Sequence, residues 1–576
     1  MTAEQTVRDD PGSVRTTTLL RNGAIYTSAE PFATAMVVEN GTVAWVGSEG
    51  EADAHTDSVT ETIDLRGALV TPAFVDAHVH ATSTGLALTG LDLSGCASRV
   101  EALDRIGAYA ASLPQDAVVL GTGWDETTWD RAASDGRRPP TRPELDRAVG
   151  GRRTYLSRVD VHSAIVSSTL LDAAPEARSA AGYAEDGPVS RDAHHAVRSA
   201  ALASVTPAQR ATAQRATLRR AAELGIGAVH ECGGPQISSE DDFTGLLALA
   251  ADPAVPTPYV FGYWGELTDP VKAVELGGVG AGGDLFIDGA IGSHTACMRE
   301  AYADAAESGL GAASTAGYAG AAYLTTEQIG GFLIACIEAQ VQPGFHVIGD
   351  YGLDLLVAGL DLAHDVLGEK RLRAARVRAE HAELPDHEHI KKFVHHGVII
   401  SAQPGFDAAW GGVDGMYAQR LGPGRSLGMN PFAAMVAAGV VLAFGSDSPV
   451  IPLGPWEAVR AAAFHHVPAS RVSARAAFAA HTRGGWRALN TKAPGVPGDE
   501  TGALMPGAPA TYAVWDVSEG YAAAQAPDVS STAVSADERA GVPGLPDLTP
   551  GVAPPRCLRT AVRGRPVHDL LPGRWA

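Results

Sequence analysis

The sequence predicts an α/β protein built on a (β/α)₈ barrel, with a composite β-sandwich from both termini and an insertion subdomain after the first barrel strand. Eight short apolar segments alternate with Ala-rich helical stretches, a rhythm typical of βα units around a parallel sheet. The gap at residues 81–227 is too long for one crossover helix. With 576 residues and 45% hydrophobic content, the chain can bury a core of this size.

The amino-terminal region predicts a tail followed by a small antiparallel β unit. Residues 1–15 are polar and bury too little apolar surface to order themselves. Residues 16–70 are expected to form the amino-terminal portion of the sandwich, in which Ala35–Val38 and Val43–Val46 flank Asn40-Gly41. This dipeptide is preferred in tight type I′ hairpins, so we expect a hairpin there.

The barrel is expected to span residues 71–490, with the insertion subdomain at about 95–205. Each predicted strand is a short apolar segment that ends in polar residues. The eight candidates are Ala73–His80, Ala228–Cys232, Tyr259–Trp264, Asp284–Gly289, Gly344–Asp350, Val377–His381, Val398–Gln403 and Val441–Asp447.

The carboxyl-terminal region, residues 491–576, is expected to complete the sandwich. Strands are expected at Ala510–Trp515 and Cys557–Val562, separated by a low-complexity surface loop at Gly520–Pro555. Neither end of the chain can make a good-sized sheet alone. We therefore expect the strands of the two ends to pair with each other.

Composition narrows the classes of function. A net charge of −22 disfavours nucleic-acid and anionic-membrane surfaces. The longest apolar run, Phe432–Gly445, is too short for a bilayer span, and no signal segment opens the chain, which indicates a soluble, cytoplasmic protein. Five Cys without a CxxC pair argue against a thiolate site, so any metal should have His and carboxylate ligands.

Two imidazoles lie two residues apart in Asp76-Ala77-His78-Val79-His80, at the end of the first predicted strand. Alternate residues of a strand share one face, so both side chains can reach one ion. Active sites of (β/α)₈ barrels are built at the carboxyl ends of the strands. The spacing therefore fits a metal site at the mouth of the barrel.

Three more potential ligands end other predicted strands: His346, His381 and Asp447. Neutral imidazole and carboxylate suit Zn²⁺, Fe²⁺ or Mn²⁺. Such a site with an open position lowers the pKa of a bound water toward neutrality. The chemistry indicated is hydrolysis.

These motifs resemble the metal-dependent amidohydrolase superfamily, specifically its YtcJ-like branch (amidohydrolase family 3), which includes N-substituted formamide deformylases. The resemblance covers nearly the whole chain and implies a metal-activated hydroxide that attacks an amide-like carbon. It rests on the segments Val70–His80, Gly123-Trp124-Asp125-Glu126 and Phe286-Ile287-Asp288-Gly289, and on His346, Glu380-His381 and Asp447.

Carried over by position, the resemblance implies that His78 and His80 hold the metal. Asp447 would be a ligand and also the general base and acid, taking a proton from the attacking water and returning it to the leaving nitrogen. His346 and His381 would bind a second metal where one is present. With one metal bound, these two could instead complete its shell or polarise the substrate carbonyl, and His381 is the catalytic candidate of the two. We expect one tightly bound ion, Zn²⁺ before Fe²⁺ or Mn²⁺, and a weaker second site.

One position departs from the family pattern. Related sequences often carry a Lys that becomes carboxylated and bridges two metals where this chain has Asp284. None of the five Lys residues ends a predicted strand, which excludes a Lys carbamate. Asp284 is then either a bridging ligand or a plain carboxylate at a strand start, and Asp288 or Glu231 could compensate.

Several residues are candidate substrate contacts. By resemblance, Trp124 and Asp125 lie near the substrate, although Trp124 could instead pack the core of the insertion. His162 belongs to the same aromatic and polar group, a possible lid. The full set is Trp124, Asp125, His162, His294, Asp288 and Gln403.

The leading hypothesis is a metal-dependent hydrolase that cleaves a non-peptide carbon–nitrogen bond in a small molecule, with a homodimer expected for such a family. An esterase, a lactonase or a cyclic-amide hydrolase could use the same site. A non-catalytic ligand-binding barrel is the alternative from another class. The pairs His194-His195, His395-His396 and His465-His466 lie in helical contexts and are interpreted as exposed residues without a role.

Overall fold

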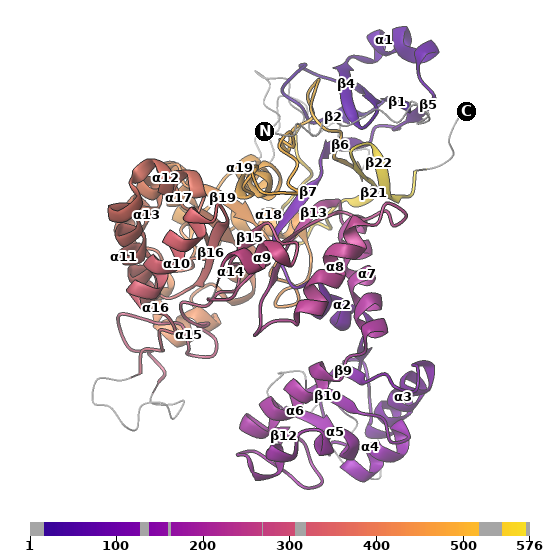
Figure 1. The fold of residues 1–576 in the computed structure, drawn as a ribbon. Coiled ribbons are helices and arrows are strands. Elements are labelled where there is room, and N and C mark those ends of the chain that lie inside the picture. Colours follow the sequence, from indigo (N-terminus) through magenta and orange to yellow (C-terminus); the bar gives the residue numbers. More distant parts are fainter. Residues whose placement is uncertain are drawn as a thin grey trace. The chain divides into compact units, whose positions relative to one another are not determined.

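The computed structural model describes residues 16–126, 129, 138–158, 163–267, 269–305, 318–517 and 544–571. The chain divides into two compact units, one formed by residues 1–80 and 218–576, the other by residues 81–217 (Figure 1). The second unit is wider than the 95–205 expected for the insertion. It starts directly after the first barrel strand, because the helix that follows His80 belongs to it.

An eight-stranded parallel sheet forms the core of the first unit, in the order β19-β18-β17-β16-β15-β14-β13-β7. The edge strands also meet, since the Asp447 amide donates to the His78 carbonyl at 2.8 Å and the His80 amide donates to the Ser448 carbonyl at 2.9 Å. The predicted barrel is confirmed. Its strands are β7 (Phe74–Val79), β13 (Ile226–Gly233), β14 (Tyr259–Trp264), β15 (Gly280–Ala281), β16 (Gln342–Val347), β17 (Arg378–His381), β18 (Ile399–Ala402) and β19 (Val441–Phe444).

The fourth strand differs from its expected range of Asp284–Gly289: β15 covers only two residues and lies earlier. Gly282 has a φ of 142°, and a Cβ there would lie 2.3 Å from the Gly344 carbonyl oxygen, so the chain bends away where it crosses β16. An isolated bridge between Phe286 and His346 then restores the parallel pairing. Asp284 therefore lies in the irregular segment beyond the strand end.

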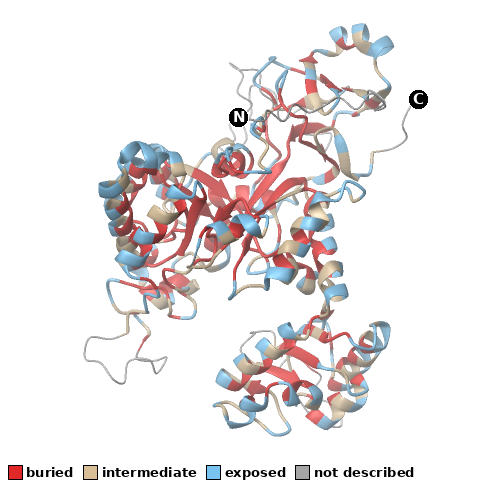
Figure 2. Cartoon of the chain, viewed as in Figure 1, coloured by how far each residue is buried: buried red, intermediate tan, exposed pale blue. Residues whose placement is uncertain are grey.

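Helices surround the strands, which are buried, and expose their outer faces (Figure 2). They are α8 (Glu240–Ala251), α9 (Val271–Glu275), α10 (Thr326–Glu338), α11 (Asp350–Leu367), α12 (Glu369–Ala375), α13 (His387–His396), α14 (Pro404–Trp410), α15 (Met416–Leu421), α16 (Pro423–Ser426), α17 (Phe432–Ala438), α18 (Pro455–Ala463), α19 (Ala474–Ala479) and α20 (Gly485–Ala488). Helix α1 (Glu49–Ala52) packs instead on the amino-terminal strands of the sandwich.

The sandwich combines strands from both ends of the chain, as expected. Its two sheets have the orders β4-β3-β1-β5 and β2-β6-β20-β21-β22, and β6 pairs antiparallel with β20. Leu20, Met36, Val70 and Val514 belong to one buried cluster within it. The strands are β1 (Thr17–Arg21), β2 (Ala24–Ile25), β3 (Ala35–Glu39), β4 (Thr42–Gly47), β5 (Glu61–Asp64), β6 (Leu69–Pro72), β20 (Tyr512–Asp516), β21 (Arg556–Val562) and β22 (Arg565–Asp569).

The predicted hairpin is confirmed: β3 and β4 pair antiparallel, and Asn40 and Gly41 between them have φ values of 49° and 80°. Strand β22 has no counterpart in the sequence prediction, because its residues are mostly polar. The expected tail at 1–15 and residues 520–543 of the expected loop lie outside the described residues.

The insertion unit contains a five-stranded sheet in the order β12-β11-β10-β9-β8, with helices packed on it. Its strands are β8 (Leu91–Asp92), β9 (Val119–Trp124), β10 (Thr154–Arg158), β11 (Ser163–Val166) and β12 (Val189–Ser190). Its helices are α2 (Ala81–Thr89), α3 (Arg99–Ser112), α4 (Arg142–Val149), α5 (Ser168–Asp172), α6 (Arg191–Ala203) and α7 (Pro207–Glu223), the last of which runs into the first unit.

The interpretation of the His pairs as exposed is wrong for one member of each. His194, His396 and His465 are buried. Each has a polar partner. His194 and His396 turn inward from their helices, whereas His465 lies just beyond the end of α18, so the helical context expected for that pair is wrong. Within the described part of the chain, no helix combines the length and hydrophobicity that crossing a membrane requires.

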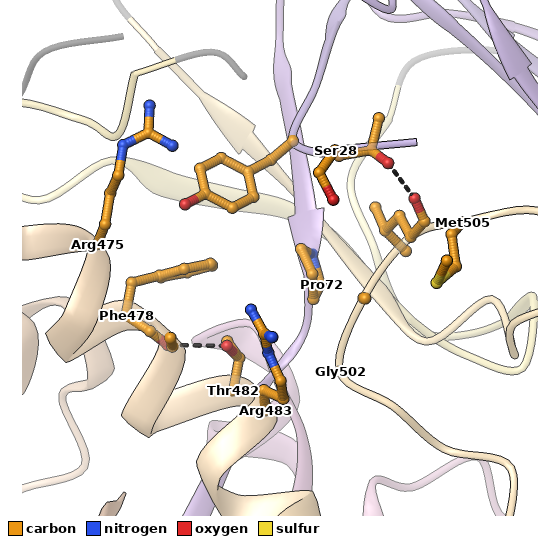
Figure 3. Close-up of a pocket in the computed structure, with 13 residues that line it drawn as sticks. Ser28, Pro72, Arg475, Phe478, Thr482, Arg483, Gly502 and Met505 are labelled. Carbon is orange, nitrogen blue, oxygen red and sulfur yellow. Dashed lines mark hydrogen bonds between the residues drawn. The ribbon is translucent and has the colours of Figure 1, made fainter. Parts of the chain in front are cut away.

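A short π-helical turn at Ala480–Gly484 joins α19 to α20 and packs on β7 and β19. The cavity on its far side measures about 270 Å³ and is lined by Tyr26, Arg475, Phe478 and Met505, among others (Figure 3). None of the candidate site residues lines it. It is therefore separate from the barrel mouth.

His481, in this turn, makes stability depend on pH. The imidazole is 1% exposed and donates from Nδ1 to the Val75 carbonyl at 3.0 Å. Burial lowers its pKa from 6.5 to about 4. Between these pH values the imidazole is protonated in the unfolded chain but not in the folded chain. The free energy of unfolding therefore decreases as the pH falls, by about 3 kcal/mol in all.

We expect His481→Asn, which keeps a donor near Nδ1, to remove this dependence. Denaturant midpoints of both proteins, measured in parallel from pH 7.5 to pH 4.5, should diverge, with the wild-type value falling more steeply. Parallel curves would contradict the assignment.

Candidate metal centre

The two imidazoles of β7 are fixed by hydrogen bonds on their far sides. His78 donates from Nδ1 to the Glu380 carboxylate at 3.0 Å, and His80 donates from Nδ1 to the Cys232 carbonyl at 2.9 Å. Each ring therefore turns its Nε2 toward the other side, where the carboxylates of Asp284 and Asp447 lie. The spacing of two residues does place both rings on one face, with centroids 5.3 Å apart.

Two more imidazoles are held in the same manner. His381 donates from Nδ1 to Gln403 Oε1 at 2.8 Å, while His346 donates from Nε2 to the Gly289 carbonyl at 3.3 Å. The remaining nitrogens, Nε2 of His381 and Nδ1 of His346, face Asp284. A hydrogen bond at the far nitrogen that fixes tautomer and orientation is what metal-binding histidines have.

Asp284 lies at the centre of these rings. Its carboxylate oxygens are 3.2 Å from His80 Nε2, 3.5 Å from His78 Nε2, 3.5 Å from His346 Nδ1 and 3.9 Å from His381 Nε2. The side chain is short, but the bend at Gly282 brings its backbone to the mouth of the barrel. The Asp284 carboxylate therefore faces all four imidazoles.

Asp447 is the second carboxylate that faces the two imidazoles of β7. Its Oδ1 lies 3.0 Å from His80 Nε2 and 3.5 Å from His78 Nε2. Both Asp447 and His381 have positive φ, at 56° and 69°. Backbone in this region costs energy in residues other than Gly and is concentrated at functional sites.

At His381 the positive φ also breaks the alternation of β17. Glu380 faces the barrel interior, where it contacts His78, and its neighbour would face outward in a regular strand. The turn instead brings His381 to the same group of side chains. Adjacent residues therefore both serve one site.

The carboxylates of Asp284 and Asp447 favour a positive charge on the groups that face them. Burial opposes protonation of His78 and His80, but Asp284 and Asp447 outweigh it and raise the pKa of both imidazoles well above the usual range. Burial likewise opposes ionisation of Asp284 and Asp447, yet the facing imidazoles lower the pKa of both carboxyls. The pKa of His346 is lowered by burial and by the charge on His381.

The side chains that face this centre fit a cation. Within the described part of the chain, His78 Nε2, His346 Nδ1, Asp284 Oδ1 and Asp447 Oδ1 are buried and make no hydrogen bond. Leaving such atoms unsatisfied is costly, so they point to a ligand. Three overlapping groups each have donor atoms within 4.8 Å of one another: His78 with His80 and Asp284, His78 with His381 and Asp447, and Asp284 with His346 and His381.

A charged layer beneath the centre was not predicted from the sequence. Arg378 donates from Nε and Nη2 to both oxygens of Glu380, at 2.8 and 3.0 Å, and its Nη1 contacts His230 Nδ1 at 2.8 Å. Arg378 and Glu380 are fully buried, and the guanidinium lies over the Tyr263 ring. Burial raises the pKa of Glu380, but Arg378 and His78 reverse this and hold it far below the usual range. The signal in the sequence was Arg378-Ala379-Glu380, with two charges on one face of a central strand.

The candidate substrate contacts in the barrel have other partners. Asp288 accepts backbone N–H groups of Cys297, Ile348 and Gly349, each at 2.8 or 2.9 Å, which indicates a loop-holding role. His294 contacts Asp304 at 2.9 Å, and Gln403 holds His381. These three residues are buried.

The other three candidates lie in the insertion. Trp124 is buried in a hydrophobic cluster of that unit and donates from Nε1 to the Leu156 carbonyl at 2.8 Å, so it does pack the core. Asp125 pairs with Arg158 at 3.0 Å. His162 lies outside the described residues.

The fold and the site define a metal-dependent hydrolase of the (β/α)₈ class. A model of the amidohydrolase family matches residues 61–568, and the chain belongs to this family. It is therefore a hydrolase of carbon–nitrogen bonds other than peptide bonds, and its site implies a divalent metal ion.

Among curated proteins, the chain is 27% identical to Protein LONG AFTER FAR-RED 3 of Arabidopsis thaliana, over 82% of this chain and 83% of that protein. It is 24% identical to the putative amidohydrolase YtcJ of Bacillus subtilis, over 76% and 82%. A shorter match, 29% identical, covers 24% of this chain and 25% of the N-substituted formamide deformylase of Arthrobacter pascens. These matches confirm the resemblance.

Among solved structures, the chain is similar to an uncharacterized metal-dependent hydrolase from Pyrococcus furiosus. The two share 25% identity with a TM-score of 0.69, over 86% of this chain and 98% of that one. This similarity confirms the predicted barrel with additional domains.

Proposed function

We propose that the protein hydrolyses a small N-acyl or N-formyl amide, with Asp447 as general base and acid. The observation that carries the proposal is the convergence of four imidazoles and two carboxylates, of which His78 Nε2, His346 Nδ1, Asp284 Oδ1 and Asp447 Oδ1 make no hydrogen bond within the described residues. The match to a deformylase of N-substituted formamides supports this choice among amides.

The ligand set that we propose is His78, His80, Asp447 and Asp284, with His346 and His381 completing the shell or holding a second ion. Imidazole and carboxylate donors favour Zn²⁺, and Fe²⁺ or Mn²⁺ would also suit them. A cation held there supplies Lewis acidity and lowers the pKa of a water toward neutrality.

Asp447 and His381 have the chemical roles. The Asp447 carboxylate accepts the proton of the attacking water and returns it to the leaving nitrogen. Its lowered pKa keeps it ionised and able to accept near neutral pH. His381 is oriented by Gln403 and presents Nε2 to the centre. Where His381 holds no ion, its raised pKa favours the ring protonated at both nitrogens, and Nε2–H would donate to the carbonyl oxygen of the substrate.

Removing the metal is expected to abolish turnover. Protein stripped with a chelator should lose about 10²-fold or more of its rate on an N-formyl amide, and Zn²⁺ should restore it. Reactivation should need more Zn²⁺ at pH 6 than at pH 8, because protons compete for the His78 and His80 imidazoles, whose pKa values are raised.

The measurement combines metal content with rates on a panel of N-formyl, N-acyl and cyclic amides, esters and lactones. The panel separates the proposed amide hydrolase from an esterase or lactonase. Undiminished turnover by protein shown to hold no metal would overturn the proposal, as would ligand binding without turnover of any compound.

A further inference from the structure

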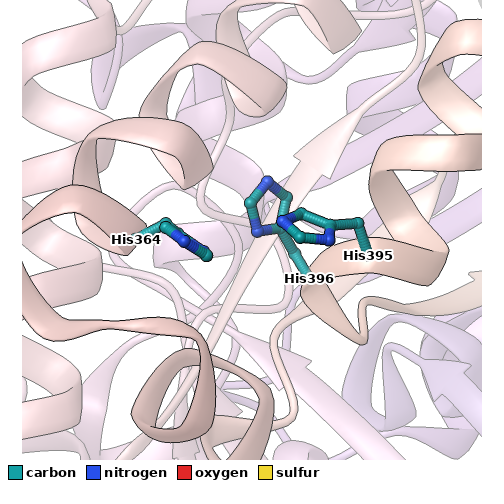
Figure 4. Close-up of side chains that lie close together, drawn as sticks. All are labelled: His364, His395 and His396. Carbon is teal, nitrogen blue, oxygen red and sulfur yellow. The ribbon is translucent and has the colours of Figure 1, made fainter.

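Three imidazoles meet on the outer helical layer, away from the barrel mouth. His364 belongs to α11, whereas His395 and His396 end α13, and the two helices pack against each other (Figure 4). One ring nitrogen of each residue lies within 4.8 Å of those of the other two. Ring centroids are 5.3 Å apart for His364 and His395, and 4.7 Å apart for His395 and His396.

The buried member of this group has a fixed orientation. His396 is 1% exposed and donates from Nε2 to Asp361 Oδ1 at 2.8 Å. That bond places its proton on Nε2, which leaves Nδ1 as an acceptor or ligand atom. A carboxylate behind an imidazole is the arrangement that orients histidine ligands and increases their basicity.

Two nitrogens of the group are buried and have no hydrogen-bond partner among the residues that the structure describes: Nδ1 of His396 and Nδ1 of His364. Such atoms are rare in proteins, because burial removes their hydrogen bonds to water and no protein group replaces them. The nearby positive charges do not fill the place, since Lys392 pairs with Asp361 and Arg373 donates to the carbonyls of Val394 and His395. A cation between the rings would satisfy both nitrogens.

We propose that His364, His395 and His396 form a second metal site, peripheral to the barrel centre, that binds Zn²⁺ or a similar borderline cation. Three neutral imidazoles with an open fourth position are a known Zn²⁺ ligand set. Around a tetrahedral Zn²⁺ the nitrogens lie about 3.3 Å apart, so the rings must close slightly. His395 is exposed and His364 is half-buried, so both rings have room to turn.

The site would link α11 to α13. Both helices belong to the barrel's outer layer, and α13 ends at Gly397 directly after the cluster. An ion bound to the folded protein and not to separated helices stabilises the fold by mass action. We therefore expect Zn²⁺ to raise the melting temperature through this cluster, independently of turnover.

The test titrates Zn²⁺ into full-length protein without a polyhistidine tag, after the barrel centre has been saturated and loose ion removed. Wild type should bind one equivalent more than the variant His364→Gln/His395→Gln, and only wild type should gain melting temperature from it. Asp361→Asn should weaken this binding about 10- to 100-fold. His387→Gln, which removes an exposed imidazole at the other end of α13, should change neither value.

Calorimetric stoichiometry and melting curves decide the outcome. Because His364 and His395 are not fully buried, the double variant should fold, which its melting temperature without Zn²⁺ checks. Equal Zn²⁺ binding by wild type and the double variant would overturn the proposal, as would an equal loss in His387→Gln. Turnover does not enter the comparison, so the outcome is independent of the function proposed for the barrel centre.

Discussion

Asp447→Asn is expected to lower kcat by about 10³-fold or more while leaving the melting curve nearly unchanged. General acid–base catalysis alone contributes 10²- to 10⁴-fold. Asn is almost the same size, and the Asp447 backbone amide keeps its bond to the His78 carbonyl. The side chain loses the ability to accept and return a proton, and it becomes a weaker ligand for a cation.

The measurement is the steady-state rate on the best amide of the panel, together with metal content. Asp241→Asn, which makes the same change at an exposed position of α8, serves as the matched control and should keep the wild-type rate. Full activity in the Asp447 variant, with metal bound, would remove Asp447 from the proposed role.

Arg378→Leu is expected to destabilise the first unit by about 3–5 kcal/mol, the usual cost of removing one partner of a buried ion pair. The Glu380 carboxylate would be left fully buried with His78 as its remaining charged partner. His230 and the Ala77 carbonyl would each lose the contact with Arg378, although Ala77 would keep the Ser401 hydroxyl as a donor. Thermal and chemical unfolding measure the loss.

A double variant separates lost charge from lost packing. Adding Glu380→Gln to Arg378→Leu removes the uncompensated charge and should recover part of the stability. Glu380→Gln by itself should weaken metal binding at the centre about 10- to 100-fold, because the acceptor that orients His78 becomes neutral. If Arg378→Leu unfolds at the wild-type temperature, the layer beneath the centre is not a structural support.

The sequence predicted those features that depend on local spacing. His78 and His80 share one face because successive side chains of a strand point to opposite faces. The polar residues that follow the other barrel strands meet because the carboxyl ends of parallel strands lie at one rim. The type I′ hairpin at Asn40-Gly41 follows from the conformational freedom of two residues. Each of these predictions depends only on residues that are close together in the sequence.

Features that depend on distant backbone were not predictable. The position of Asp284 is set by a bend at Gly282, which in turn reflects how closely Gly344 of the next strand approaches. The partnership of Glu380 with His78 joins residues 302 positions apart. Helical context likewise could not show which imidazole of His395-His396 turns inward, since that depends on how α13 packs against α11.

The pairing of β6 with β20 constrains how the chain folds during its synthesis. The Trp515 indole bonds the Thr71 hydroxyl from 444 residues away, in the sheet that leads into β7. A ribosome releases the amino end first, so β6 can pair with β2 but remains without β20 while the barrel emerges. We expect nascent chains that stop short of Tyr512 to need chaperones and to be sensitive to proteases.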